Sequence, residues 1–196
     1  QLSALVDQSL VQRTAVGPYN LHNIIRQYAA EHLQSDSAIY RETVAQYGRY
    51  TLHWLAEQDA VLRGPGQKEG LTAVAEELAN VRAAWSWGTA QHCYTGLRRA
   101  AFALFYFYEL RGLIHDGEAL FRQTAEALQA DAAASDADAS DADETERQVT
   151  IWAMQTNQAY FLHRLGQTNA AHSLLVPIVP QLELAGEENI LSYSLR

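Results

Sequence analysis

The residues whose types could support chemistry in this chain form no recognisable reaction centre. Cys93 follows His92, but no base and orienting group accompany the pair, so a reactive thiol is disfavoured. The histidines show no His-x-x-x-His or Cys/His spacing of a zinc site, and we expect most of them on helix faces. Glu76-Glu77 and Glu187-Glu188 are adjacent pairs that point in different directions on a helix, so neither is an acid/base pair. We therefore expect no enzyme activity.

Two further motifs fail as ligand sites. Gly64-Pro65-Gly66-Gln67-Lys68-Glu69 has neither the glycine spacing nor the hydroxyl of a phosphate-binding loop, and indicates a turn between helices. Asp136-Ala137-Asp138 lacks the glycine and the later ligands of a calcium loop. We therefore expect no metal and no cofactor bound by this chain alone, and no ATP hydrolysis by it.

Two other stretches allow a binding interpretation and a structural one. Arg98-Arg99 would meet an acidic partner or, as we favour, lie on a solvated helix face. The aromatic run Phe102–Tyr108 would line a ligand groove or, as we favour, pack in the core. Both stretches belong to one predicted helix, apolar almost all round, which should lie between other helices.

The charge pattern argues against nucleic acid as a partner. The formal net charge is -9, but seven acids and no base lie between Asp131 and Glu146, and the remaining residues include 14 basic and 16 acidic side chains. Nucleic-acid binding needs a concentrated positive surface, which is missing here. The sequence has no apolar run of roughly 20 residues and no leader, so we expect neither a membrane partner nor secretion. A single cysteine is typical of a cytoplasmic protein.

The elements that must position these residues are mostly helices. Apolar periodicity predicts a short helix over residues 2–10, a small hairpin turned at Gly17-Pro18, and a helix over residues 23–33 with Asn23 as its N-cap. Further helices are expected over these ranges: 37–62, 69–89, 94–111, 117–130, 146–165 and 169–184. Pro177 and Pro180 should kink the last of them or end it early.

Two segments repeat one pattern, in which an aromatic-rich helix leads through a glycine turn into a helix that begins with small residues. The first is Phe105–Leu110, Gly112 and Gly117-Glu118-Ala119; the second is Ala159–Leu165, Gly166 and Ala170-Ala171. Small residues let paired helices approach closely. The pattern resembles tetratricopeptide-type repeats, which stack helical hairpins into a superhelix with a concave binding face. An irregular helical bundle remains the alternative.

The opening segment carries a second resemblance. The run from Leu2 to Val11, the hairpin, and the run from Tyr19 to Ala29 resemble the winged-helix segment of the NB-ARC and related STAND signalling ATPases. Leu21-His22-Asn23 stands where that family has Met-His-Asp, whose histidine contacts the β-phosphate of ADP. The resemblance implies this role for His22 in a full-length protein. Asn23 for aspartate keeps the capping ability and loses a charge.

Together these patterns predict a mainly α fold: stacked antiparallel helical hairpins, a tetratricopeptide-like superhelix, preceded by a partial winged helix with a small β-hairpin. We expect residues 1–34 to end a winged-helix domain and residues 35–91 to form a connecting helical hairpin. Residues 92–196 should form helical repeats, truncated at the C-terminus, with a disordered acidic insertion over 131–145, because its Ala/Asp/Ser sequence buries little apolar surface.

The functional expectation is a non-catalytic regulatory and interaction fragment of an ATP-dependent signalling protein or transcriptional regulator. The chain begins at Gln1 without methionine, as an excised piece would. Its expected partners are an upstream nucleotide-binding domain and a protein, peptide or small-molecule inducer on the helical arm. Self-association through an uncapped end with Ile190, Leu191 and Leu195 is also expected. The alternative is a stand-alone helical-repeat scaffold without nucleotide coupling; a DNA-binding winged helix would require salt-sensitive duplex binding.

Overall fold

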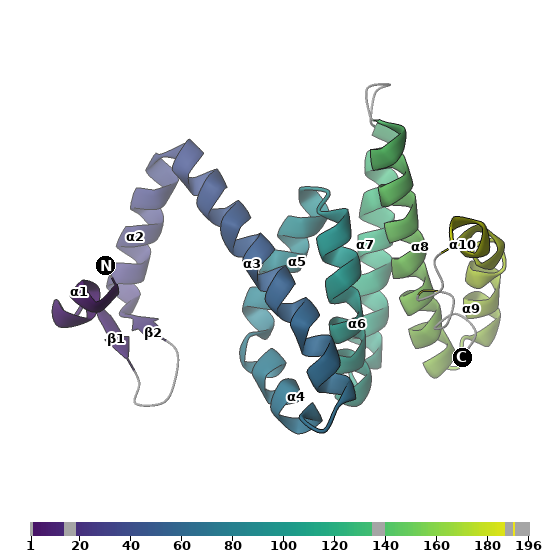
Figure 1. The fold of residues 1–196 in the computed structure, drawn as a ribbon, viewed down its shortest axis with the longest axis horizontal. Helices are drawn as coiled ribbons and strands as arrows, with labels where there is room; N and C mark the ends of the chain where they lie inside the picture. Colours follow the sequence, from purple (N-terminus) through teal and green to yellow (C-terminus); the bar gives the residue numbers. More distant parts are fainter. Residues whose placement is uncertain (1, 14–18, 135–139, 187–189, 191–196) are drawn as a thin grey trace. The chain divides into compact units, whose positions relative to one another are not determined.

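The computed structural model describes residues 2–13, 19–134, 140–186 and 190, and the chain is mainly helical (Figure 1). Its contacts divide it into two compact units, residues 1–46 and 47–196. The boundary lies inside one long helix and not after residue 34, and no second boundary falls near residue 91. The reason is that helices before and after residue 91 share one hydrophobic core.

The first unit begins with helix α1 (Leu2–Asp7), strands β1 (Val11–Arg13) and β2 (Tyr19–Leu21), and helix α2 (Asn23–Ser35). The strands pair antiparallel, with Val11 opposite Leu21 and Arg13 opposite Tyr19. The predicted turn at Gly17-Pro18 lies outside the described residues. Val11 is buried, whereas α2 buries none of its residues.

The start of α2 corrects the sequence prediction by one residue. The N-cap is His22, not Asn23, and its Nδ1 accepts a hydrogen bond from the backbone N–H of Ile24 at 3.4 Å. An imidazole nitrogen can take the place of the usual Asn or Ser oxygen, because any acceptor that reaches the free N–H groups of the first turn satisfies them.

Helix α3 (Ser37–Arg63) belongs to both units, because the boundary after Gln46 lies within it. Asp36 begins it, because its Oδ1 accepts hydrogen bonds from the N–H groups of Ala38 and Ile39, both at 3.0 Å. The remaining helices are α4 (Gln67–Glu76), α5 (Leu78–Ala90), α6 (Tyr94–Leu110), α7 (Ile114–Ala134), α8 (Asp141–Arg164), α9 (Thr168–Leu175) and α10 (Val179–Ala185).

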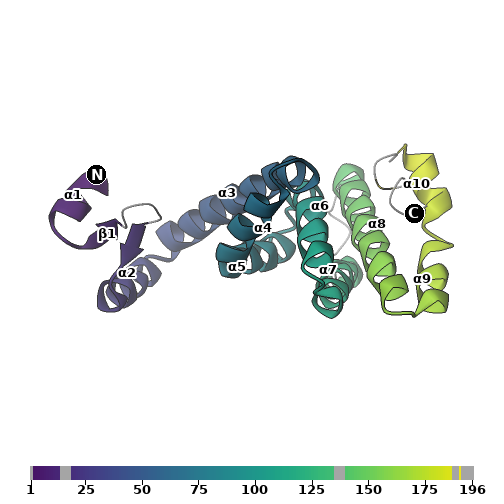
Figure 2. The same ribbon diagram turned by 90° about the horizontal axis from the view of Figure 1, so that it is seen from below.

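The core of the second unit surrounds α6, as its apolar sequence predicted. Helix α6 contacts α5, α7 and α8, and α7 and α8 lie side by side (Figures 1 and 2). Most of the aromatic run Phe102–Tyr108 is buried, which confirms core packing for Phe105, Phe107 and Tyr108. Burial on every face is what an all-round apolar helix requires.

Close helix pairing depends on glycine at several of the described positions, among them Gly48, Gly88 and Gly117. A Cβ added to Gly117 of α7 would lie 2.7 Å from the ring of Phe161 on α8. That ring in turn packs against Phe105 and Phe121, with centroids 5.4 and 6.0 Å away. Small residues were expected to bring the two helices of one hairpin together, but at Gly117 the close approach is to α8 of the following hairpin and not to α6.

Three turns between helices share one hydrogen-bond pattern. At α6–α7, Gly112 has a φ of 68°, its N–H donates to Glu109, and the N–H of Leu113 donates to Tyr108. At α8–α9, the same bonds run from Gly166 to His163 and from Gln167 to Leu162; at α5–α6, they run from His92 to Thr89 and from Cys93 to Gly88. This is the Schellman ending, in which a left-handed residue closes the helix.

Two predicted helix boundaries differ from the structure or test it closely. The helix expected over 69–89 is divided at Glu77, which separates α4 from α5 and accepts a side-chain hydrogen bond from Asn80. Pro177 follows the end of the helix that begins at Thr168, since α9 stops at Leu175, whereas Pro180 lies in the first turn of α10, which starts at Val179.

The expected disordered insertion over 131–145 is wrong at both ends. Helix α7 continues to Ala134, and α8 begins at Asp141 after the N-cap Ser140, whose Oγ accepts from the N–H of Asp143 at 3.2 Å. Alanine is the strongest helix former, and a capping serine followed by acids favours a helix start, so local preference extends both helices. Residues 135–139 lie outside the described residues.

Candidate functional site

A groove of about 500 Å³ lies between the second-unit part of α3, helix α6 and helix α8. We call it the α3–α6–α8 groove. Its lining residues are His53, Ala56, Glu57, Asp59, Arg63, Arg98, Arg99, Ala101, Phe102, Ala153, Thr156, Asn157 and Ile190. The volume lies in the range of small-ligand sites, and the lining combines apolar side chains with a few polar ones.

The charged side chains that α3 contributes to the groove pair among themselves. His53 Nε2 lies 3.4 Å from Glu57 Oε1, and the Arg63 guanidinium pairs with Asp59 Oδ2. These i,i+4 pairs follow from helical spacing. They leave this wall close to neutral.

Arg98 of α6 also has an acidic partner within the chain. Its Nη2 lies 2.7 Å from Glu146 Oε2 on α8, and its Nη1 donates to the Glu146 carbonyl at 3.4 Å. The Thr95 hydroxyl donates to the same carboxylate at 3.2 Å. The pair joins α6 to α8 at the edge of the groove and removes the positive charge of Arg98 from ligand binding.

Two polar groups in the groove remain without a partner. Arg99 is exposed, and among the described residues its guanidinium has neither an ion pair nor a hydrogen bond. Asn157 is only 4% exposed, yet in the same part of the chain its side-chain amide has no hydrogen-bond partner. Asn157 also lines the groove. Buried amides without partners are rare in folded proteins.

Two further oxygen atoms beside this groove are buried without a hydrogen bond in the described structure: Thr156 Oγ1 on α8 and Asp59 Oδ1 on α3. Each can accept a hydrogen bond, and the hydroxyl can also donate one. Phe102, Ala153 and Ile190 supply apolar surface to the same groove. The arrangement can therefore bind a molecule that has both polar and apolar parts.

A second cavity, of about 580 Å³, lies between α5 and α7 and has a different character. Its buried polar atoms already have partners, since the Trp85 indole N–H donates to Thr124 Oγ1 at 2.8 Å. The Thr124 hydroxyl donates to the Leu120 carbonyl at 2.8 Å, and the Thr89 hydroxyl donates to the Trp85 carbonyl at 3.0 Å. These bonds serve the packing of α5 on α7, so we place the candidate site in the α3–α6–α8 groove.

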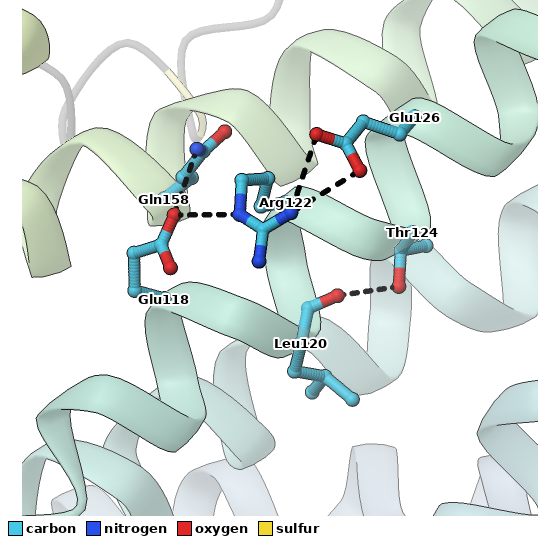
Figure 3. A network of polar contacts seen from close by, with 6 residues as sticks. All are labelled: Glu118, Leu120, Arg122, Thr124, Glu126 and Gln158. Carbon is cyan, nitrogen blue, oxygen red and sulfur yellow. Dashed lines mark hydrogen bonds and ion pairs between the residues drawn. The ribbon is translucent and has the colours of Figure 1, made fainter.

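A polar network connects α7 to α8 (Figure 3). Arg122 lies between Glu118 and Glu126, at 3.2 and 3.3 Å, and Gln158 of α8 donates to Glu118 at 3.0 Å. The hydrogen bond to Glu126, followed by the charge of Glu118, raises the pKa of Arg122 above its usual value. The hydrogen bond from Gln158 to Glu118 joins α8 to α7, while the contacts of Arg122 lie within α7.

His22, which the sequence singled out, lies in the first unit and is exposed. Its ring caps α2 through Nδ1, and it lines neither the α3–α6–α8 groove nor the second cavity. The phosphate role that the resemblance implies for His22 therefore remains a prediction, while its local role is helix capping.

The structure separates the neighbours Arg98 and Arg99, which the sequence treated alike. Arg98 meets an acidic partner within the chain, whereas Arg99 is exposed, in agreement with the favoured interpretation, and also lines the groove. Cys93 is half-buried and lines a small adjoining cavity of about 140 Å³ that also includes Arg99. His53 of α3 lines the same small cavity.

Sequence reasoning missed Thr156 and Asn157. Both lie on the buried side of α8, in Thr156-Asn157-Gln158, where three consecutive polar residues are 9% exposed or less. A polar run inside an otherwise apolar helix was the available signal, because buried polar groups require partners. This polar run did not stand out in the sequence, because α8 begins with a long polar stretch of its own.

The described residues contain no cluster of three or more His, Cys, Asp or Glu side chains placed to hold a metal ion. None of the helices formed by these residues has both the length and the apolar character needed to span a membrane. Comparisons with protein-family models, with curated proteins and with solved structures found no match to this chain.

Proposed function

We propose that this chain is a non-catalytic regulatory and interaction module that binds a partner or ligand in the α3–α6–α8 groove. The observation that carries the proposal is Asn157, which is 4% exposed, lines the groove and has no hydrogen-bond partner for its side chain among the described residues. A ligand that pairs with this amide would add a hydrogen bond with a net contribution of roughly 0.5–1.5 kcal/mol. A purely structural helix face would be more stable with an apolar residue there.

The arm fits the proposed tetratricopeptide-like interpretation in its local geometry. The α6–α7 and α8–α9 hairpins end in the same Schellman turn, at Gly112 and Gly166. Such repeats bind partners on a concave surface. Here α6 and α8 are the first helices of the two hairpins, and both line the groove.

Binding in the groove can be tested with a screen that assumes no particular partner. A mixed set of small organic compounds and short peptides would be screened against the ¹⁵N-labelled chain by NMR. We expect hits to perturb amides of residues 98–102 and 153–157, and to be lost in Ala56→Trp, which fills the groove from α3. Ala127→Trp, which fills the second cavity, is the control and should retain them.

Hits that gather in the second cavity, or that bind Ala56→Trp as well as the unaltered chain, would contradict this site. A wide set that leaves every groove amide unmoved would contradict the binding function itself.

We further propose that the module belongs to a longer ATP-dependent signalling protein or transcriptional regulator, and that its first unit responds to ADP. This part rests on the resemblance of Leu21-His22-Asn23 and its flanking segments to STAND-type winged helices. The exposure of His22 is compatible with contact to a preceding nucleotide-binding domain.

ADP release tests this coupling in the longer protein. His22→Ala should accelerate ADP dissociation roughly tenfold or more, because a hydrogen bond to a charged phosphate is lost. His32→Ala is the control, since His32 is an exposed histidine of the same helix, stacked on Tyr28. Equal ADP dissociation in both variants would instead favour the alternative, a helical-repeat scaffold without nucleotide coupling.

The proposed self-association through the C-terminal end has less support. Ile190 is buried in a cluster with Val149, Ile178 and Leu182, so it is covered within the chain. Leu191 and Leu195 lie outside the described residues. Leu184 of α10 is 83% exposed and remains available at this end.

A further inference from the structure

We infer that the ligand of the α3–α6–α8 groove is a small carboxylic acid with an amide group and an apolar substituent, of the kind found in an N-acylated amino acid. This inference rests on the proposed binding function and names its ligand class. Three features of the groove, taken one at a time, lead to it.

The carboxylate follows from Arg99. In the described structure, His53, Arg63 and Arg98 each lie against an acid, and Arg99 is the groove cation for which no acidic partner is found. A guanidinium binds a carboxylate through two parallel hydrogen bonds, which a neutral ligand cannot supply. The groove therefore favours a negative charge at the α6 wall near Arg99.

The amide follows from Asn157. A side-chain amide offers both an N–H donor and a C=O acceptor, so a second amide satisfies both at once. A carboxylate alone would leave the acceptor of Asn157 unpaired.

The apolar substituent follows from the rest of the lining. Phe102 is half-buried, Ile190 and Ala153 are buried, and all three contribute to the groove surface. Covering such surface with a branched alkyl group removes it from water. A cavity of about 500 Å³ accommodates one acylated residue with room for ordered water.

A matched pair of probes tests the inference on the full chain. N-acetylleucine carries the carboxylate, and N-acetylleucinamide replaces it by a neutral amide of nearly the same shape. We expect both to perturb groove amides in ¹⁵N NMR titrations, with the acid bound about tenfold more tightly, because a charged hydrogen bond to Arg99 is added.

The variants assign the two contacts separately. Arg99→Ala should remove the preference for the acid, Arg99→Lys should retain part of it, and Arg111→Ala, an exposed arginine just beyond the other end of α6, should leave it unchanged. Asn157→Ala should weaken both probes by the same factor, since both contain the acetamide. Circular dichroism of each variant establishes that it is folded.

The outcomes also separate this inference from the proposed function. Equal affinity for the two probes, or a preference for the acid that survives Arg99→Ala, would overturn the ligand class while leaving the groove a binding site. Absence of any perturbation of groove amides by N-acetylleucine would overturn it too, and only failure of the wide screen would remove the groove function. The peptide acetyl-Ala-Ala-Ala-Leu shares the terminal chemistry, and its relative affinity tells whether the acid is free or ends a peptide.

Discussion

At the scale of single residues, this structure is distinguished by which buried polar groups have partners. The Trp85 indole N–H of α5 donates a hydrogen bond to the Thr124 hydroxyl of α7, and the Gln158 amide donates one to Glu118. Asn157, one position before Gln158, has no such partner in the described structure. Neighbouring residues of similar polarity thus serve packing in one case and, by our proposal, binding in the other.

The Trp85–Thr124 contact supports a stability prediction. Thr124→Val keeps the volume of the side chain and removes its oxygen, so the buried indole N–H is left without an acceptor. We expect a loss of about 1–3 kcal/mol in the free energy of unfolding, measured by urea denaturation. Thr72→Val removes an exposed hydroxyl that bonds Lys68 and should change stability by less than about 0.5 kcal/mol. Equal effects would show that the indole finds another acceptor.

At the scale of elements, the helices end by backbone conformation as much as by sequence. Gly112 and Gly166 close α6 and α8 in the left-handed region, with φ of 68° and 77°. At the third equivalent turn, His92 adopts a φ of 55°, a conformation that costs a residue with a Cβ about 1–2 kcal/mol. The sequence indicated the glycine turns but gave no sign that a histidine occupies the same role.

This difference predicts opposite effects of exchanging residues at the turns. Gly166→Ala should lower the free energy of unfolding by about 1 kcal/mol, although an added Cβ meets nothing within 4 Å there, because only the backbone is strained. His92→Gly should raise it by up to about 1 kcal/mol, less what is lost with its ring contact to Tyr94. Thermal or urea unfolding checks both, and a stabilising Gly166→Ala would contradict the assignment of these turns.

Packing of one helix on another predicts a different kind of loss. Gly117→Ala places a Cβ against the ring of Phe161 and should destabilise the chain by about 1–3 kcal/mol, since α7 and α8 must move apart or the ring must shift. In the Phe161→Leu background the same change should cost clearly less. A double-mutant cycle measures this coupling, and additive costs would mean that the ring is not what limits the approach.

At the scale of the whole molecule, burial is distributed unevenly between the two units. Helix α2 buries no residue, whereas α6 buries eight. Amide protection follows local burial and packing, so the two units should open with different free energies.

Hydrogen exchange followed by mass spectrometry tests this expectation on the intact chain. Peptides from residues 23–35 should exchange much faster than peptides from residues 97–108, at a pH where the intrinsic rates are comparable. Similar protection in both regions would mean that the first unit has contacts of equal strength, and would argue against its independence from the second.

The sequence by itself determined the helical class, the approximate ends of most helices and the two glycine turns. These properties depend on residues close together in the chain, namely apolar spacing, left-handed glycines and prolines that cannot continue a helix. The same reasoning correctly assigned Phe105 and Phe107 to the core, because no helix exposes so much aromatic surface on every face.

Only the tertiary structure decided which polar residues face one another. Arg98 and Arg99 are adjacent in sequence, but the first meets Glu146, 48 residues away, and the second lines the groove. Whether Asn157 is satisfied depends on side chains that α3 and α6 bring to α8, and no local pattern records their arrangement. Partner choice for buried polar groups is set by contacts distant in the chain, so a candidate site made of such groups emerges only with the fold.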